Sequence, residues 1–101
     1  MPAQIVAEEQ DVLAFRDLKP QAPTHLLIIP KTHIGGLPDV TPTHRTVLTS
    51  AILLATRLAR EHGLEKSGYR LVANVGPHGG QSVFHLHWHL LGGRQMQWPP
   101  G

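Results

Sequence analysis

Three histidines at alternate positions, His85, His87 and His89, are the residues of this sequence best suited to chemistry. If residues 83–91 form a strand, their three imidazoles share one face of it, because successive side chains point to opposite sides. The other face would carry apolar residues: Leu86, Trp88 and Leu90. A solvated sheet face normally carries Thr, Lys or Glu rather than imidazoles. We therefore expect one face to be core and the other to perform chemistry.

Two kinds of chemistry fit the histidine face. In the first, neighbouring imidazoles with backbones roughly 6.6 Å apart share one metal ion, and a further ligand such as His25 or Asp17 comes from elsewhere. In the second, a neutral imidazole attacks phosphorus and forms a labile phosphorus–nitrogen bond. The neighbouring imidazoles would then hold the reactive tautomer and donate to phosphoryl oxygens.

The glycine-rich segment just before the histidines favours phosphate chemistry. Gly79-Gly80-Gln81-Ser82 can turn several backbone N–H groups inward to hold an anion, and Ser82 adds a hydroxyl donor. A metal site would not need such a loop. Placed directly before a histidine face, the loop predicts an anion held beside a nucleophile.

The remaining sequence predicts an α+β fold. Five short segments read as strands: 5–8, 12–17, 25–29, 69–74 and 83–91. Residues 41–62 form an amphipathic helix, which Thr41 or Thr43 can cap and Gly63 ends. The order β-β-β-α-β-β favours an antiparallel sheet with one helix packed on it, followed by an irregular tail at 92–101.

The composition bounds the possible functions. A chain of 101 residues makes one domain, and its net charge of +2 does not argue for a nucleic-acid surface. Its lack of cysteine excludes a disulfide scaffold, a cysteine zinc site and a thiol nucleophile. No apolar run reaches the roughly 18 residues of a membrane helix, and the first residues do not resemble a signal peptide. We expect a cytoplasmic protein without a membrane partner.

The histidine segment and its flanks resemble a known family. Residues 85–91 have the His-x-His-x-His-x-x form of the histidine triad (HIT) superfamily. The flanking residues 79–84 and 92–101 are similar to the histidine triad nucleotide-binding (Hint) branch in particular, as are 14–17, 20–25 and 29–34. The resemblance runs from about Val12 to the end of the chain and is weakest through the helix.

This resemblance implies a fold and an activity. Hint proteins are α+β homodimers in which two five-stranded antiparallel sheets join into one ten-stranded sheet. They hydrolyse purine nucleoside 5'-phosphoramidates to AMP or GMP and an amine, without a metal or another cofactor. By the match, His87 is the nucleophile and forms a nucleotidyl-histidine intermediate that water cleaves. The implied partners are the purine nucleotide and a second copy of the chain.

The resemblance also implies roles for individual residues. His89 would contact a phosphoryl oxygen, His85 and His25 would orient His87, and Ser82 would lie near the leaving group. The other implied positions are Asn74, Gly80 and Gln81 with Ser82 at the phosphate, Asp17 at the ribose hydroxyls, Phe15 and Leu18 at the base, and Trp98 in a tail that reaches the partner's site. The other histidines, His33, His44, His62 and His78, are expected to be incidental.

The sequence departs from the family at two places. Trp88 is larger than the usual Val, Leu or Ile, and the family's N-terminal segment, which adds to the base pocket, is short here. Three alternatives stay open: a dinucleoside polyphosphate hydrolase or nucleotidyl transferase of a sister branch, a non-catalytic nucleotide-binding dimer, and a metalloprotein. For assembly, we expect dimerisation through the helix and the edge at 69–74, since a small sheet leaves edges that need protection.

Overall fold

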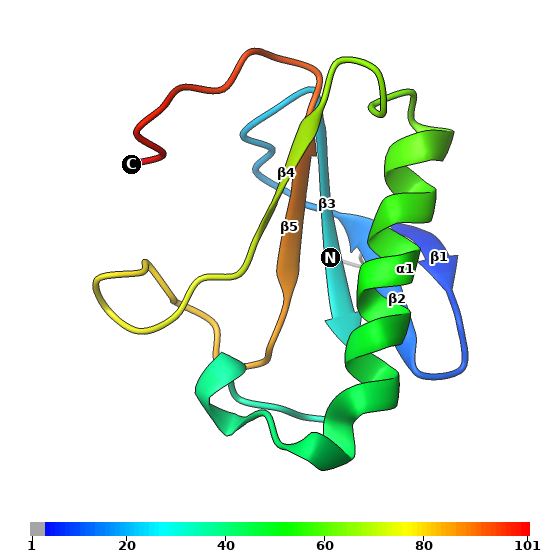
Figure 1. Cartoon of the computed structure of the whole chain (residues 1–101), viewed down its shortest axis with the longest axis vertical. Helices are drawn as coiled ribbons and strands as arrows, with labels where there is room; N and C mark the ends of the chain where they lie inside the picture. Colours follow the sequence, from blue (N-terminus) through cyan, green and yellow to red (C-terminus); the bar gives the residue numbers. More distant parts are fainter. Residues whose placement is uncertain (1–3) are drawn as a thin grey trace.

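Five antiparallel strands and one main helix make up this protein, and the computed structural model describes them over residues 4–101. The strands are β1 (Ile5–Glu8), β2 (Val12–Arg16), β3 (Thr24–Pro30), β4 (Tyr69–Val72) and β5 (Trp88–Gly92), in the sheet order β1-β2-β3-β5-β4. Helix α1 (Arg45–Glu61) lies against the sheet after two short 3-10 turns, η1 (Leu37–Asp39) and η2 (Pro42–His44) (Figure 1). The predicted α+β class is confirmed.

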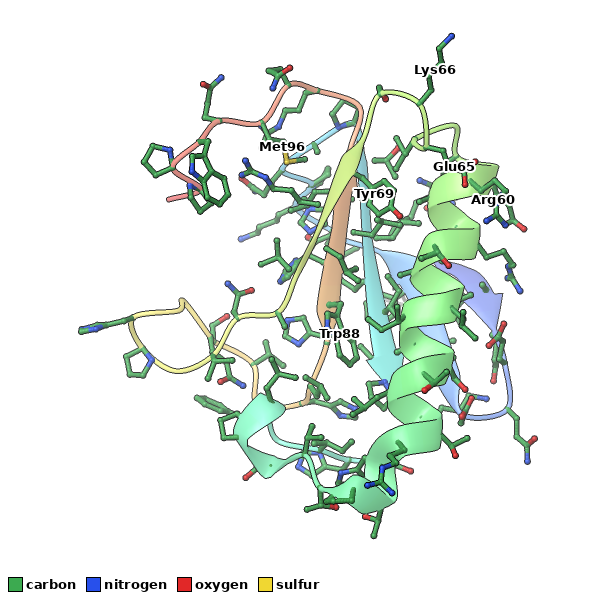
Figure 2. All side chains as sticks on the ribbon, viewed as in Figure 1. Arg60, Glu65, Lys66, Tyr69, Trp88 and Met96 are labelled. Carbon is green, nitrogen blue, oxygen red and sulfur yellow. The ribbon has the colours of Figure 1, made fainter. Side chains whose placement is uncertain are left out.

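The core lies between α1 and the central strands. Leu54 and Leu58 on α1 pack with Leu26 and Ile28 on β3, and all four side chains are at most 1% exposed. Burying each such side chain contributes roughly 1.5–3 kcal/mol to stability. Trp88 extends from β5 into the same cluster, so its large ring is accommodated by packing (Figure 2). One face of the sheet is thereby committed to the core.

The register of β3 and β5 decides which residues share the other face. Leu27 pairs with His89, and His25, two residues before Leu27, lies on the same side of β3. Since the residues on either side of Leu27, Leu26 and Ile28, are fully buried on the core side, this second face collects His25, Leu27 and His89. The two central strands therefore bring histidines from distant parts of the chain together.

The last strand is shorter than the sequence predicts. It was expected over 83–91, but β5 begins only at Trp88, and residues 83–87 have no regular structure. On one side, the pairing of β3 with β5 ends at Ile28 and Trp88, and the backbone N–H of Leu86 donates to the carbonyl of Ile34 instead of to a strand. On the other side, β4 stops at Val72, opposite His89. Strict strand geometry therefore applies to His89, while other contacts position the two preceding histidines.

Two further boundaries differ from expectation. The helix begins at Arg45 rather than near Thr41, because Pro42–His44 form a 3-10 turn in which the Thr41 N–H donates to His44 Nδ1 at 3.0 Å. The strand predicted at 69–74 ends at Val72, so Asn74 lies in the glycine-rich loop. Within residues 4–101, no helix has the length and apolar character needed to cross a membrane.

Candidate active site

Two adjoining cavities lie where the histidines gather. The polar cavity, of about 250 Å³, is lined by Asp17, Leu27, Asn74, Gly80, Gln81, Ser82, Val83, His87 and His89. The apolar cavity, of about 350 Å³, is lined by Phe15, Leu27, Ile29, Val83, His85 and His87. His87 borders both cavities, together with Leu27 and Val83. A polar and an apolar compartment sharing one histidine suit a ligand with a charged and an apolar part.

His87 is held in one tautomer by its own backbone neighbourhood. Its Nδ1 lies 2.7 Å from the carbonyl oxygen of His85. A carbonyl can only accept, so Nδ1 carries the proton and Nε2 keeps a free lone pair. The ring of His85 in turn donates from Nε2 to Pro30 O at 2.8 Å, and His33, expected to be incidental, lies edge-on to it with centroids 5.2 Å apart. This arrangement leaves the Nε2 of His87 as a nucleophilic nitrogen.

His25 and His89 form a direct hydrogen-bonded pair. The Nε2 of His25 lies 2.8 Å from the Nδ1 of His89, and a carboxylate oxygen of Asp17 lies 3.5 Å from the same Nε2. On its other side, His25 Nδ1 accepts the backbone N–H of Gln21 at 3.0 Å. The resemblance implied that His25 orients His87, but the hydrogen bond of His25 is with His89. Any influence of His25 on His87 therefore passes through His89, whose ring centroid lies 5.1 Å from that of His87.

Burial keeps this pair neutral. It lowers the pKa of His25, against the opposing effect of Asp17. For His89, burial again lowers the pKa most, and the neighbouring His87 and His25 lower it further, with Asp17 opposing. A proton on either ring costs more in the folded protein than in water.

The lowered pKa values predict that acid destabilises the fold. Between the folded pKa values and the unfolded value of 6.5, the unfolded chain binds more protons, so the free energy of unfolding rises with pH. This stabilisation is fully present above pH 6.5 and is lost as the pH falls through the folded pKa values. We expect a lower urea midpoint at pH 5 than at pH 7.5, with a smaller difference in His25→Gln than in His78→Gln, a change at an exposed position. An equal difference in both variants would contradict this explanation.

Two amide side chains fasten the glycine-rich loop beside the histidines. Gln81 accepts the Gly76 N–H through Oε1 at 3.1 Å and donates from Nε2 to the carbonyls of Gly35 at 3.0 Å and Val83 at 3.3 Å. Asn74 donates from Nδ2 to Gly79 O at 2.7 Å. The side-chain amides thus hold the loop's shape, and the Gly80–Ser82 backbone borders the polar cavity.

The structure brings together most of the residues singled out in the sequence, with two exceptions. Those that line a cavity are Phe15, Asp17, Asn74, Gly80, Gln81, Ser82, His85, His87 and His89, with His25 directly behind His89. Leu18 is 64% exposed and Trp98 81% exposed, and neither borders the polar or the apolar cavity formed by the described residues. Trp98 lies instead against the Arg70 guanidinium, 5.8 Å from its ring centroid.

Three lining residues were missed by the sequence analysis: Leu27, Ile29 and Val83. Leu27 and Ile29 alternate with the buried Leu26 and Ile28, so a period-two reading starting at His25 would have placed them on the histidine face. For Val83 the sequence held no comparable signal, because it precedes the regular part of the last strand.

Comparisons with known proteins agree with this geometry. The family model described as "HIT domain" matches residues 1–96. The 14 kDa zinc-binding protein of Zea mays is 53% identical over 103 residues, covering all of this chain and 80% of the relative. A HIT family hydrolase from Legionella pneumophila superposes with a TM-score of 0.97 at 55% identity, over 100% of this chain and 90% of that one. A histidine triad nucleotide-binding protein from Candida albicans superposes with a TM-score of 0.81 at 27% identity, over 98% of this chain and 76% of that one.

The family model spans nearly the whole chain, and its match includes the three alternate histidines and the glycine-rich loop before them. The maize relative and the Legionella structure extend the similarity over the full length at more than half identity. This chain therefore belongs to the HIT domain family.

Proposed function

We propose that this protein hydrolyses purine nucleoside 5'-phosphoramidates to a nucleoside 5'-monophosphate and an amine. The observation that carries the proposal is the tautomer of His87, whose protonated Nδ1 faces His85 O and leaves Nε2 unprotonated, in a residue that borders both cavities. The hydrolase and nucleotide-binding names of the structural relatives support the reaction class. The Hint-like flanks of the histidine segment support the phosphoramidate substrate.

The reaction proceeds in two steps at phosphorus. His87 Nε2 attacks the α-phosphorus, the phosphorus–nitrogen bond to the amine breaks, and the departing amine takes up a proton from solvent, with Ser82 beside its path. The imidazolium so formed keeps its proton on Nδ1, which donates to His85 O. Water then attacks the same phosphorus, breaks the bond to Nε2 and gives up a proton. The backbone N–H of Ser82 and an N–H of His89 stabilise the charge on the phosphoryl oxygens, while the N–H groups of Gly80 and Gln81 hold the loop by donating to Pro77 O and Gly76 O.

The rest of the nucleotide fits the neighbouring walls. The Asp17 carboxylate, whose second oxygen accepts the Lys19 N–H at 2.7 Å, borders the polar cavity and is the acceptor for the ribose hydroxyls. Phe15, Leu27 and Ile29 line the apolar cavity and receive the purine. In this proposal, the phosphoryl group lies at the junction, next to His87.

Turnover of two substrate types tests the proposal. We expect an adenosine phosphoramidate to be hydrolysed at least tenfold faster, by kcat/KM, than a diadenosine polyphosphate, and a nucleotidyl-protein adduct to be trapped by mass spectrometry. Faster polyphosphate cleavage would assign the chain to the sister activity. Nucleotide binding with no adduct and no turnover would make it a non-catalytic nucleotide-binding protein.

We also propose that the protein forms a homodimer. Strand β4 is an edge of the sheet, so one side of its backbone lacks a strand partner within residues 4–101. Tyr69, at the start of β4, is 37% exposed (Figure 2). Helix α1 exposes two further large apolar side chains, Leu53 (62%) and Ile52 (41%). A second copy that covers β4 and this side of α1 would bury these apolar side chains.

Charge placed on the exposed side of α1 should weaken this dimer. We expect the wild-type chain to have a dimeric mass at micromolar concentration in light scattering, and Leu53→Glu to raise the dimer dissociation constant about tenfold or more. Leu37→Glu, at an exposed leucine on η1, is the matched control and should keep the wild-type mass. A monomeric wild-type mass would refute the dimer.

Zinc binding is the second candidate, since the maize relative is named for it. Asp17, His25 and His89 each offer one ligand atom, and these atoms all lie within 4.8 Å of one another. The hydrogen bonds do not fit a metal, however. A neutral histidine that binds through Nε2 carries its proton on Nδ1, yet His25 Nδ1 faces the Gln21 N–H as an acceptor. The residues therefore do not fit a zinc ion, and neither step of the proposed reaction uses one.

A further inference from the structure

The hydrogen bonds behind the polar cavity form a single directed chain. At one end stands the backbone N–H of Gln21, which can only donate and which points at His25 Nδ1 at 3.0 Å. At the other end stands the free nitrogen of His89, Nε2, in a residue that lines the cavity. Between them lies the 2.8 Å contact from His25 Nε2 to His89 Nδ1.

The direction of each bond follows from the fixed donor. Because His25 Nδ1 accepts, the proton of the neutral His25 ring sits on Nε2, where it is donated to His89 Nδ1. The Asp17 carboxylate, 3.5 Å from the same Nε2, favours a proton there as well. His89 Nδ1 is thereby an acceptor, and the proton of the neutral His89 ring is on Nε2. The polar cavity thus receives an N–H donor.

We propose that the backbone N–H of Gln21 sets the tautomers of His25 and His89, so that His89 presents an N–H to the phosphoryl oxygens and the Asp17–His25–His89 group does not take a divalent metal. Gln21 is a positioning residue, since it acts through two other residues. The catalytic part of this inference rests on the proposed phosphoramidase function. The part about the tautomers and the metal selectivity is independent of that function.

The backbone N–H of Gln21 is held in place by the contacts of its own residue. The residue follows Pro20, its side chain donates to Lys19 O at 3.0 Å, and its carbonyl accepts from Arg94 Nε at 3.0 Å. His25 itself is only 6% exposed, so water does not readily replace the amide as the partner of Nδ1. The tautomer is therefore fixed by backbone geometry rather than by a titratable neighbour.

Nitrogen NMR of the wild-type protein gives the first test and needs no variant. In protein labelled with ¹⁵N-histidine at pH 8, His25 and His89 are both expected to carry their proton on Nε2, with an unprotonated Nδ1. Finding His25 protonated on Nδ1 would overturn the proposal, whatever the enzyme assays show.

A backbone ester in place of the Pro20–Gln21 peptide bond gives the second test. The ester replaces the N–H with an oxygen of similar size, which repels the Nδ1 lone pair and should shift the proton of His25 to Nδ1. We expect zinc, measured by competition with a chromogenic chelator, to bind at least about tenfold more tightly to the ester protein than to wild type. Gln21→Ala, which keeps the N–H and loses the side-chain bond, should match wild type in NMR and zinc affinity. Equal zinc affinity in all three proteins would overturn the metal part.

Turnover separates the catalytic part from the rest. If the proposed function holds, the ester should lower kcat for the phosphoramidate about 10- to 100-fold with a smaller change in KM, because the donor to the developing charge is lost. Circular dichroism checks that the ester protein is folded. A folded ester protein with the shifted tautomer and unchanged kcat would refute the role of His89 as a donor. If wild type itself shows no turnover, the proposed function fails while the tautomer and zinc results still stand.

Discussion

His87→Asn should abolish turnover of an adenosine phosphoramidate, with kcat reduced by about 10⁴-fold or more, while the protein stays folded and binds AMP with an affinity close to that of wild type. Asparagine matches the polar shape of the imidazole near the backbone and keeps an N–H that can donate to His85 O. It offers no nucleophilic nitrogen to phosphorus. Losses of this size are usual when a covalent nucleophile is removed.

The control for this prediction is a histidine of the same chain outside the cavities. His78 is exposed in the glycine-rich loop and borders neither the polar nor the apolar cavity, so His78→Asn should leave kcat within about twofold of wild type. AMP affinity would be measured by calorimetry and the fold by circular dichroism. If His87→Asn retained a tenth or more of the wild-type kcat, the nucleophile would lie elsewhere.

Gly79→Ala should lower kcat/KM about 100-fold through the shape of the glycine-rich loop. A Cβ on Gly79 would lie 2.8 Å from the backbone nitrogen of Val75, 2.9 Å from its carbonyl carbon and closer still to its carbonyl oxygen. These are backbone atoms, so the loop itself must move. Its displacement would break the loop's own bonds from Gly80 N–H to Pro77 O and from Gln81 N–H to Gly76 O, and would carry the Ser82 N–H away from the phosphoryl position. A misplacement near 1 Å can cost about 10²-fold in rate.

The matched control places the same methyl group where it has room. In Gly35→Ala the added Cβ would meet only the carboxylate end of Asp39, an exposed side chain that can rotate away. The Gly35 carbonyl would still accept from Gln81 Nε2. We expect kcat/KM within about threefold of wild type for this variant. Similar losses in both variants would show that the close approach of Gly79 to Val75 is not what holds the phosphate site.

Much of the site could be predicted from local sequence, for reasons of strand geometry. Alternation through residues 85–90 correctly separates the buried Leu86, Trp88 and Leu90 from the half-buried histidines, because the alternation persists past the end of regular pairing. The apolar run after His25 predicts a central strand. The spacing of Leu54 and Leu58 predicts the helix face that covers it.

Other features depend on pairing between distant segments, which the sequence does not specify. Nothing in the sequence shows that the pairing of β3 with β5 ends at Ile28 and Trp88 or that residues 83–87 leave the strand. Likewise, the match to the family placed His25 near the nucleophile, whereas the register of β3 with β5 brings it to His89. Leu18 follows Asp17 directly, yet the chain turns there and leaves Leu18 exposed.

The sequence by itself determined the residue types of the site: three alternate imidazoles, a glycine-rich loop, an acidic residue and apolar strand positions. These are encoded within short segments, where period-two geometry and backbone freedom act locally. Only the tertiary structure decided which nitrogen of each imidazole carries the proton. That choice depends on the Gln21 N–H at His25, on His25 at His89 and on the His85 carbonyl at His87. The pairing of β3 with β5 places the second contact, and the folded conformation of two irregular segments fixes the other two, which join residues four and two apart. A neutral imidazole in a free chain exchanges between two tautomers, and a fixed partner at one nitrogen decides whether the other is a donor or a nucleophile.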